Sequence, residues 1–300
     1  MKINYNKPPH SFIKCKNREI AVFSTEGKNI DHSVVEAFGD EWLKFQNYTD
    51  NTIDIFVKEY FDILTNEIVN ENTYAIDIGC GTGRWTKYLS TRAGFIEAID
   101  PSDAVIAADN LLEGIDNMRL TKASVETIPF DDETFDFAMS VGVLHHIPNT
   151  QQAMIDCVKK VKKEGYFYCY LYYNLDNRGT AFKFLFHVSN VIRKVVSNLP
   201  GTSKKIVCDI LAAVIYLPIV LVVRFFYFIG MKNFANRLPL SPYRNKNFFV
   251  LRNDALDRFG TKLEQRFSKK EVIEMMKQSG LTDIIVGATA PYYRAIGKKI

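Results

Sequence analysis

The cysteine and histidine patterns of disulfide scaffolds and zinc sites are missing from this sequence. The 300 residues include five cysteines and five histidines. No two cysteines form a C-x-x-C pair, and no histidines cluster at metal-ligand spacing. The first residues, MKINYNKPPHSF, are too polar for a signal peptide. We therefore expect no structural disulfide, no bound metal, and a protein of the reducing cytoplasm.

Apolar runs of membrane-spanning length are also missing. The longest run covers 210–223, which is 14 residues, whereas a spanning helix needs about 20. Pro218 lies inside this run and Arg224 follows it. Both residues disfavour a simple membrane span.

Acidic side chains are nearly absent from positions 178–246. This segment holds eleven Lys or Arg side chains and one acid, Asp209, so its net charge is +10; because the whole chain carries +4, the rest carries −6. Residues 181–199 have apolar positions at helical spacing, with Lys183, Arg193 and Lys194 among the polar ones. This predicts a basic amphipathic helix, followed by an apolar helix over 206–231.

Two interpretations of this basic and apolar insertion stay open. It is either a helical lid that packs its apolar face on a catalytic domain, or a lid that also contacts an anionic membrane surface through 181–231. A membrane span is the least favoured alternative. We expect no nucleic-acid partner, because the apolar run between the basic residues would make no favourable contact with phosphate groups.

The most informative motif is AIDIGCGTGRW at 75–85. An apolar run ends in a glycine series and passes into a helical pattern, which predicts a strand, a tight turn and a helix start. Glycines suit a turn where a ligand sits against bare main chain, and a helix N-terminus suits an anionic group. The candidate ligand-binding residues are Asp77, Gly79, Cys80, Gly81 and Gly83. Arg84 is a candidate partner for a carboxylate, or a solvated residue of the first helical turn.

Three further motifs follow in order. A β-rich run at 95–99 ends at Asp100 and Pro101, and an acid at this place can bind both hydroxyls of a ribose. ASVETIPF at 123–130 and FDFAMSVGVLHHIPN at 135–149 come next. From these segments we add Ser124, Val125, Ser140 and Val141 as candidate cofactor-binding residues.

In order and spacing, the four motifs resemble the class I S-adenosylmethionine (SAM) methyltransferases, within their large quinone- and small-molecule-methylating subgroup. The resemblance covers about 72–174 and implies SAM as the cofactor. Many relatives have an aspartate where this chain has Ser124, and that aspartate accepts a hydrogen bond from the adenine amino group. The Ser124 hydroxyl can still accept one, and the Val125 N–H is a candidate donor to the adenine ring.

Strand and helix patterns alternate from residue 74 onward. Strands are expected near 74–78, 95–99, 118–122, 135–140 and 165–173, and two more at 282–288 and 292–298 around Pro291. Helices are expected at 31–45, 52–69, 84–91 and 269–279, the last with a Ser268–Glu271 capping box and a stop at Gly280. The predicted fold is α/β: a Rossmann-like class I methyltransferase fold with a mostly parallel seven-stranded sheet, an antiparallel C-terminal strand and a helical hydrophobic insertion.

The expected organisation has four parts. Residues 1–50 form an N-terminal segment, weakly periodic and partly irregular over 1–30, with a helical cap at the mouth of the cofactor site. Residues 51–178 form the SAM-binding core, 179–247 the lid insertion, and 248–300 the completion of the core.

Methyl transfer from a sulfonium is an in-line displacement, so the protein mainly aligns the reactants and excludes water. A general base is needed only for a protonated acceptor. His146, and with less support His145, are candidates, and the alternative is that they anchor their loop. Tyr172, Tyr173, Asn174 and Asp176 follow the fifth strand and either line an acceptor site or belong to an ordinary loop.

Segments outside the core, VVEAFGDEWLKF and FVLRNDALDRFGTKLEQRFSKKEVIEMMKQSGL, resemble methyltransferases of surface-glycan and other envelope pathways. This implies a small or lipid-linked acceptor, with a glycan among the candidates. The alternatives are a quinone-type aromatic lipid as acceptor, or a non-catalytic SAM-binding protein at a membrane. The expected location is the cytoplasm, at the inner face of the cell membrane if the insertion contacts lipid. The charged residues near 252–266 either reach an acceptor phosphate or carboxylate or pair with one another: Arg252, Asp254, Asp257, Arg258 and Arg266.

Overall fold

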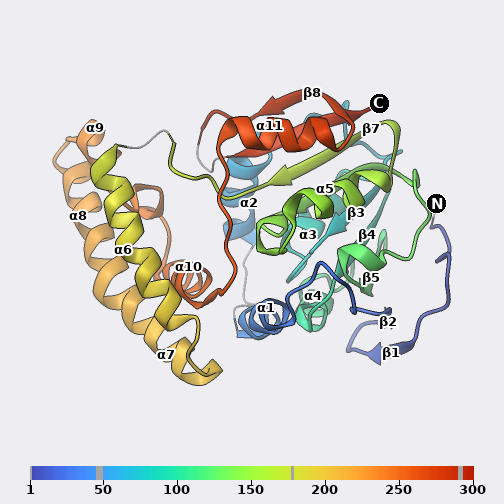
Figure 1. The fold of residues 1–300 in the computed structure, drawn as a ribbon, viewed down its shortest axis with the longest axis horizontal. Helices are drawn as coiled ribbons and strands as arrows, with labels where there is room; N and C mark the ends of the chain where they lie inside the picture. The colour runs from blue at the N-terminus through green and yellow to red at the C-terminus, as the bar shows by residue number, and fades with distance from the viewer. Residues whose placement is uncertain (1, 45–49, 177–178, 290–292) are drawn as a thin grey trace. The chain divides into compact units, whose positions relative to one another are not determined.

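The computed structural model describes residues 2–44, 50–176, 179–289 and 293–300. The chain divides into two compact units (Figure 1). The α/β unit comprises Met1–Asn174 and Leu263–Ile300, and the helical unit comprises Leu175–Lys262. The helical unit extends on both sides of the expected insertion, 179–247. It includes α10 (Phe248–Gly260) because this helix packs on two helices of the insertion rather than completing the core.

The α/β unit is built on one sheet whose strand order is β1-β2-β5-β4-β3-β6-β7-β9-β8. The six consecutive strands from β2 to β7 in this order run parallel to one another, and β9 runs antiparallel to both β7 and β8. The seven strands from β5 to β8 confirm the predicted mostly parallel sheet with a reversed C-terminal strand. The strands are β1 (Ser11–Lys14), β2 (Glu19–Val22), β3 (Tyr74–Ile78), β4 (Phe95–Asp100), β5 (Met118–Lys122), β6 (Phe135–Val141), β7 (Val161–Tyr170), β8 (Leu281–Val286) and β9 (Arg294–Lys299).

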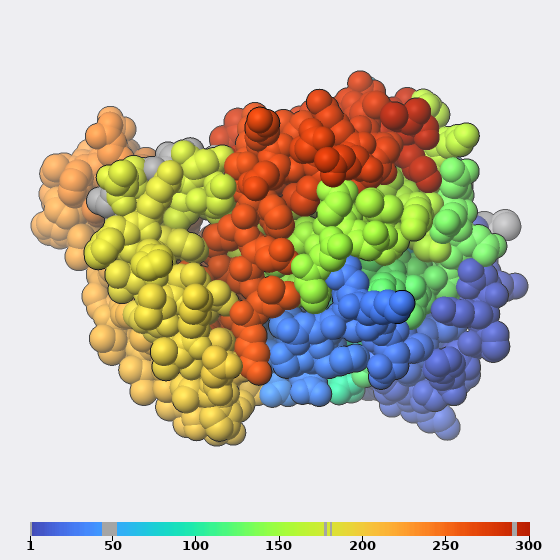
Figure 2. All heavy atoms as spheres, in the orientation of Figure 1, coloured from blue at the N-terminus to red at the C-terminus, as the bar shows by residue number. Residues whose placement is uncertain are grey.

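A short N-terminal hairpin extends the sheet where the sequence predicted a partly irregular segment. Strand β1 pairs antiparallel with β2, and β2 pairs parallel with β5 through Ala21 and Val22. Ile20 and Ala21 are buried. Four-residue strands are too short to show a clear alternation, which is why the pattern missed them. The N-terminal residues form the surface of this edge of the α/β unit (blue in Figure 2).

The helices of the α/β unit largely follow the prediction. They are α1 (His32–Lys44), α2 (Asp50–Tyr60), α3 (Arg84–Ser90), α4 (Ala104–Leu111), α5 (Thr150–Lys159) and α11 (Lys269–Gln278). The Ser268–Glu271 capping box of α11 is present, and Gly280 follows the helix with φ 84°. Of the expected helix and strand ends, Phe45, Pro291 and Tyr292 lie outside the described residues.

One predicted helix, 52–69, is too long. Helix α2 ends at Tyr60, and the chain continues in turns. The apolar residues Phe61, Leu64 and Val69 are buried from these turns. Their spacing therefore reflects burial against the sheet rather than a continuing helix.

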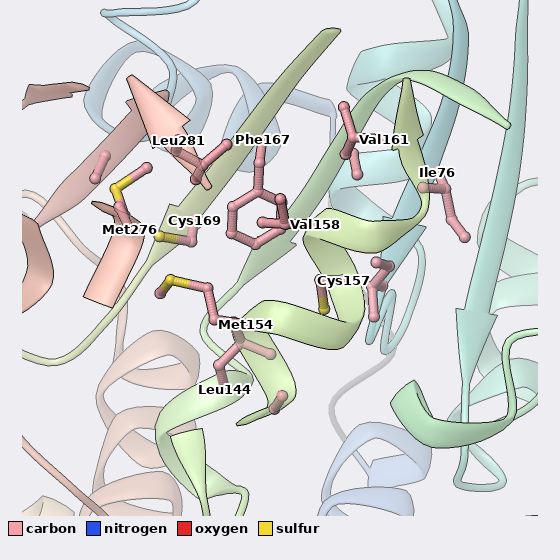
Figure 3. Close-up of a cluster of buried hydrophobic side chains, with 14 of the residues drawn as sticks. Ile76, Leu144, Met154, Cys157, Val158, Val161, Phe167, Cys169, Met276 and Leu281 are labelled. Carbon is pink, nitrogen blue, oxygen red and sulfur yellow. The ribbon is translucent and has the colours of Figure 1, made fainter. Parts of the chain in front are cut away.

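Two layers of helices cover the sheet. On one face, α5 and α11 pack on β3, β6 and β7, where Phe167 and Cys169 point toward Met154 and Val158 (Figure 3). On the other face, α3 and α4 pack on alternate residues of the same strands, such as Tyr168. Strands buried on both faces explain why the β3 and β6 sequences are almost continuously apolar.

The helical unit contains α6 (Thr180–Val196), α7 (Gly201–Leu211), α8 (Leu217–Phe228), α9 (Lys232–Ala235) and α10. A π-helical segment, η3 (Ala212–Tyr216), joins α7 to α8 just before Pro218, which has no N–H for the regular ladder. Gly201–Phe228 thus forms one helix of 28 residues, long and apolar enough by composition to cross a membrane. A single such helix is weak evidence for a span, because core helices of soluble proteins share these properties.

A buried arginine ties the last strand to the segment before β3. The Arg294 side chain is fully buried, and its guanidinium donates to both carboxylate oxygens of Asp62 at 2.8 and 2.7 Å. It also donates to the carbonyl oxygen of Thr289 at 2.7 Å. This planar fork needs arginine, because a lysine ammonium cannot make both carboxylate bonds in this geometry.

We expect Arg294→Lys to lower the free energy of unfolding of the α/β unit by about 1.5–3 kcal/mol, because charge-assisted hydrogen bonds to a buried group are lost. Urea denaturation followed by tryptophan fluorescence measures this, since Trp42 and Trp85 both lie in the α/β unit. The matched control is Arg237→Lys at an exposed position of the helical unit. Equal denaturation midpoints for both variants would contradict the role of Arg294.

Candidate active site

The glycine turn lies over the C-terminal end of β4. The N–H groups of Gly79 and Cys80 both donate to the carbonyl oxygen of Ile99, at 2.8 and 2.9 Å. Gly79 and Gly81 have φ of 81° and 54°, in the left-handed region that favours glycine. A Cβ on Gly79 would lie 2.5 Å from Val143 Cγ2, and one on Gly81 would lie 3.3 Å from Trp42 Nε1. The Val143 and Trp42 side chains therefore lie directly against the turn, where a residue larger than glycine would meet them.

Asp100 connects this turn to the end of β4. One oxygen accepts from the Gly81 N–H at 2.9 Å, and the other accepts from the N–H and the hydroxyl of Ser102 at 2.9 and 2.6 Å. Burial raises the pKa of Asp100, and these hydrogen bonds oppose that shift. A carboxylate offers about four acceptor sites. The three bonds leave one acceptor site, on the oxygen that accepts from Gly81. The ribose contact expected of Asp100 stays a prediction.

Asp77 lies fully buried beneath the turn. One carboxylate oxygen accepts from the Thr86 hydroxyl at 2.6 Å. The other has no hydrogen-bond partner among the residues that the structure describes. Burial raises the pKa of Asp77 to about 7; the negative charge of Asp100 also raises it, whereas the Thr86 hydrogen bond lowers it. Two buried carboxyl groups that resist ionisation favour a ligand that brings positive charge.

The remaining predicted cofactor-binding residues lie at the same edge of the sheet. Pro101 follows Asp100, and Gly83 precedes α3 with φ 80°. The Ser140 hydroxyl donates to the carbonyl oxygen of Ile78 at 3.0 Å, and Val141 ends β6. The sheet thus brings the glycine turn, the β4 end and the β6 end together, as parallel strands require.

Ser124 keeps its capacity to accept a hydrogen bond. Its hydroxyl lies 3.0 Å from the Thr127 hydroxyl, which in turn donates to the carbonyl oxygen of Ser24 at 2.5 Å. Because the Thr127 hydrogen is used, Ser124 donates to Thr127. The Ser124 hydroxyl also accepts from the Thr127 N–H in a capping box, which leaves one further lone pair. Val125 begins a short 3-10 helix, η1 (Val125–Thr127), directly after it.

Arg84 lies among aromatic rings at the start of α3. Its guanidinium carbon is 5.1 Å from the Trp42 ring centroid and 4.6 Å from that of Trp85. These distances indicate cation–π contacts. The Arg84 guanidinium therefore packs on aromatic rings of α1 and α3. It lies next to the glycine turn, as its position in the sequence predicted.

The two histidines occupy a short 3-10 helix, η2 (Leu144–His146), after β6. His145 stacks on Tyr172 with 3.9 Å between ring centroids, and neither of its ring nitrogens has a hydrogen-bond partner among the described residues. Burial lowers the pKa of His145 well below its usual value, so the ring is neutral at neutral pH. His146 Nδ1 lies 2.7 Å from the carbonyl oxygen of Leu263, so Nδ1 carries the proton and Nε2 the lone pair.

The residues expected near an acceptor divide between the two units. In the α/β unit, the N–H of Asn174 donates to the carbonyl oxygen of Phe267 at 2.9 Å, and Arg266 pairs with Glu264 at 2.8 Å. Arg266 also donates to the carbonyl oxygen of Tyr173, and its guanidinium carbon lies 5.0 Å from the Tyr172 ring centroid. Asp176 belongs to the helical unit.

The charged residues of α10 make bonds within the helical unit. Arg252 pairs with Asp209 at 2.6 Å, Arg258 donates to the Ser189 hydroxyl at 2.8 Å, and Asp254 accepts from Tyr243. Asp257 lies one helical turn after Asp254 on the same helix. The Arg252–Asp209 pair is a salt bridge, as the second interpretation expected, whereas Arg258 and Asp254 here bond to hydroxyl groups.

Sequence reasoning missed three residues that shape the site: Trp42, Ser102 and Thr86. Trp42 covers Gly81, and from the same helix Phe38 lies 4.7 Å from His146 between ring centroids. Helix α1 thus lies against both the glycine turn and His146. The signal for Ser102 was its position two residues after an acid, which is a common capping arrangement.

Comparison with known proteins bears on this geometry. Residues 76–169 match the family described as a methyltransferase domain. The match includes the glycine turn, Asp100, the end of β6 and both histidines.

Residues 76–169 form a class I, SAM-dependent methyltransferase domain.

Relatives of this methyltransferase domain differ in their acceptors. The chain is 29% identical over 106 residues to sterol 4-C-methyltransferase strm-1 of Caenorhabditis elegans, covering 34% of this chain and 32% of that protein. It is 29% identical over 111 residues to demethylmenaquinone methyltransferase of Staphylococcus aureus strain JH9, covering 34% of this chain and 44% of that protein. The chain thus spans less than half the length of these relatives.

Among solved structures, the YcgJ protein of Bacillus subtilis is 14% identical and has a TM-score of 0.46, covering 79% of this chain and 70% of that chain. A likeness at this level carries no functional conclusion.

The residues of the methyltransferase domain fit its cofactor, SAM. Asp100 retains an acceptor site for a hydroxyl on the oxygen that accepts from the Gly81 N–H. The space beside Gly79 and Gly81 is occupied by Val143 and Trp42, so the fit rests on the two buried carboxyl groups. The buried Asp77 oxygen without a described partner marks a place where a cationic ligand would compensate a desolvated carboxyl group.

The raised pKa of Asp77 predicts a pH-dependent stability. The unfolded carboxyl ionises near 3.8 and the folded one near 7, so between these values the folded state binds more protons. Its free energy of unfolding therefore falls as pH rises from 4 to 7 and levels above. Asp77→Asn should lack this component, so the variant should gain stability relative to the wild-type protein over that range. Urea denaturation at pH values from 4 to 8, without SAM, measures the difference, and parallel curves would show that Asp77 does not titrate there.

Replacing Asp100 by asparagine should weaken SAM binding. The amide has one accepting oxygen and no negative charge. Either the two Ser102 bonds are lost or the Gly81 and cofactor bonds are lost together, and the bonds that remain are weaker, at about 1.5–3 kcal/mol or roughly ten- to a hundredfold in affinity. Isothermal titration calorimetry measures it. The control is Asp103→Asn, which removes a half-exposed carboxylate paired with Lys122. Unchanged affinity in Asp100→Asn would remove Asp100 from the cofactor site.

Proposed function

We propose that this protein is an enzyme that transfers a methyl group from SAM to a lipid-linked acceptor at a membrane surface. The observation that carries the proposal is the glycine turn held by Asp100 above the buried Asp77, within a methyltransferase domain. SAM supplies a methyl group on a positively charged sulfur, which is a good leaving group. The protein's part is to bind, align and exclude water.

The cap helix α1 supports the exclusion of water. Trp42 lies against Gly81, and Phe38 lies against His146, so one helix covers both the cofactor turn and the histidine pair. Val143 links the same two features, because it fills the space beside Gly79 and its carbonyl oxygen accepts from the His146 N–H at 2.9 Å. Movement of α1 would open the turn and the histidines together.

His146 is the proposed general base for a hydroxyl or other protonated acceptor. Its Nδ1–H bond to Leu263 orients the ring and leaves the basic lone pair on Nε2. His145, held neutral by burial against Tyr172, is suited to shaping the pocket rather than taking a proton.

The acceptor class is inferred from the helical unit and from the relatives. The helical unit exposes apolar side chains from α6 and α8, including Phe184 and Phe225, and carries most of the chain's excess positive charge. The relatives are named for a sterol and a menaquinone precursor, both apolar lipids. The resemblance to envelope enzymes favours a glycan carried on a lipid anchor as the acceptor. In this proposal the protein acts at the cytoplasmic face of the membrane and contacts it through 181–231. A quinone-type aromatic lipid is the second candidate.

With methyl-labelled SAM and a membrane lipid extract, we expect label in the organic phase. His146→Asn should lower kcat by roughly a hundredfold or more while SAM affinity stays unchanged. The control is His10→Asn at an exposed position.

Each other outcome has a distinct meaning. SAM binding without transfer to any lipid or aqueous fraction would favour the non-catalytic binder. Transfer that survives in His146→Asn would remove the base role and leave the transfer intact. Label in quinone lipids alone would favour the second candidate.

A further inference from the structure

The polarity of helix α6 is partly inverted. It buries the charged Arg193, which is 7% exposed, and exposes the apolar Val191 and Val195, which are 53% and 65% exposed, although Val196 is buried. A helix on the surface of a water-soluble domain does the opposite. The outer surface of α6 and α7 is seen in yellow in Figure 2.

The buried polar groups of α6 are satisfied inside the unit by α10. Arg193 donates to the carbonyl oxygens of Thr261 and Lys262 at 3.0 and 2.7 Å, and to the side chain of Asn190 at 2.8 Å. Ser189 accepts from Arg258 at 2.8 Å. The inversion is thus built into the packing, because these bonds require the polar side of α6 to face α10.

The long helix Gly201–Phe228 shows the same pattern. Its charged residues bond within the unit: Asp209 pairs with Arg252 at 2.6 Å, and Arg224 donates to the carbonyl oxygens of Arg244 and Lys246. Its exposed side forms a continuous apolar stripe with helical spacing, about 33 Å long at 1.5 Å per residue. The stripe consists of Ile206, Ile210, Val214, Leu221, Phe225 and Phe228.

Exposed cations border these apolar faces. Lys183 and Lys194 lie on the exposed side of α6, and Lys232 and Arg237 follow α8. Only one acid, Asp209, is present between 178 and 246, against eleven basic residues. An apolar surface edged by positive charge is complementary to a bilayer that contains anionic lipid.

The chain connections exclude a membrane span. Helices α6 and α10 run in the same direction, since Ser189 meets Arg258 and Arg193 meets Thr261. Helix α7 runs the other way, with Asp209 beside Arg252 and Arg224 bonded to Lys246. If these helices crossed a bilayer, Thr180 and Lys262 would lie on opposite sides of it.

Both ends are tied to the same α/β unit. Lys262 is followed by Leu263, whose carbonyl oxygen bonds to His146 in that unit. At the other end, Asn174 bonds to Phe267 in that unit, and the chain from Asn174 to Thr180 reaches at most about 21 Å. This is less than the about 30 Å of bilayer hydrocarbon, and it carries Asp176 and Arg178, which are costly in lipid.

We infer that the helical unit lies in the plane of an anionic membrane, with the exposed stripes of α6 and Gly201–Phe228 immersed in the outer part of one leaflet. This deepens the proposed function, on which it rests for its purpose, by naming the partner of the helical unit. The embedded stripes would hold the enzyme at the depth where the head group of a lipid-linked acceptor meets water. Basic residues draw the protein to the surface, and apolar immersion then retains it.

Vesicle flotation of the full chain tests the immersion. Vesicles of phosphatidylcholine with phosphatidylglycerol should bind the protein without SAM or acceptor, and much of the binding should persist at about 1 M salt, where the Debye length is about 3 Å. Ile210→Asp should weaken partitioning by roughly tenfold or more. The matched control is Ile285→Asp on β8, because Ile285 is 55% exposed and Ile210 is 54% exposed.

The orientation has its own measurement. Single tryptophans at Ile206→Trp, Val214→Trp and Phe228→Trp sample both ends and the middle of the stripe. Quenching by lipids brominated at different depths, with the wild-type signal subtracted, should place all three at one shallow depth. A deeper middle position would show a span and overturn the in-plane arrangement.

Three results would overturn the inference. Wild-type binding that vanishes in high salt and is unaffected by Ile210→Asp would indicate electrostatic attachment without immersion. Absence of vesicle binding with a change of oligomeric state in Ile210→Asp would assign the stripe to a second copy of the chain. Absence of binding with a loss of thermal stability would assign it to packing within the protein. None of these results depends on methyl transfer, so the proposed enzymatic activity is judged separately.

Discussion

The geometry of the cofactor site depends on the Asp100 carboxylate. It joins the end of β4 to the glycine turn through the Gly81 N–H and holds the following residues through Ser102. The turn is therefore set by one buried charged group and by glycines whose conformations no other residue adopts easily. The same carboxylate has one acceptor site left, so the group that holds the turn is also the one proposed to bind the ligand.

Burial of this carboxylate has an electrostatic consequence. Asp77 and Asp100 are both buried, and the loss of solvation raises the pKa of each carboxyl group. The ionised carboxyl groups are less stable without a ligand than with a cationic ligand, because a nearby positive charge stabilises the ionised forms. SAM carries positive charge at its sulfur and its amino group. Its binding would therefore stabilise the ionised carboxyl groups that burial destabilises.

The helical unit is governed by a different physical constraint. Polar side chains of α6, α7 and α10 bond within the unit, and apolar side chains such as Val220 and Val223 form its core. Further apolar side chains, including Phe184 and Phe225, remain exposed on its surface. A large exposed apolar surface of this kind is typical of an interaction site rather than of a surface that faces only water.

Much of the α/β unit was predictable from the sequence, because its determinants are local. The run 74–78, the glycine spacing and the acid at 100 each depend on neighbours within a few residues, so strands, turn and cofactor edge follow from the pattern. The Ser268–Glu271 box and Gly280 bounded α11 in the same way. The apolar spacing over 61–69 was misleading, since burial on a sheet and a helix face produce similar periods. Tertiary structure alone decided that Trp42 covers Gly81, that 11–22 forms a hairpin on β5, and that Arg193 of α6 faces α10. Each of these depends on partners distant in the chain, and a periodic pattern shows that a helix has two faces without showing which face meets the protein.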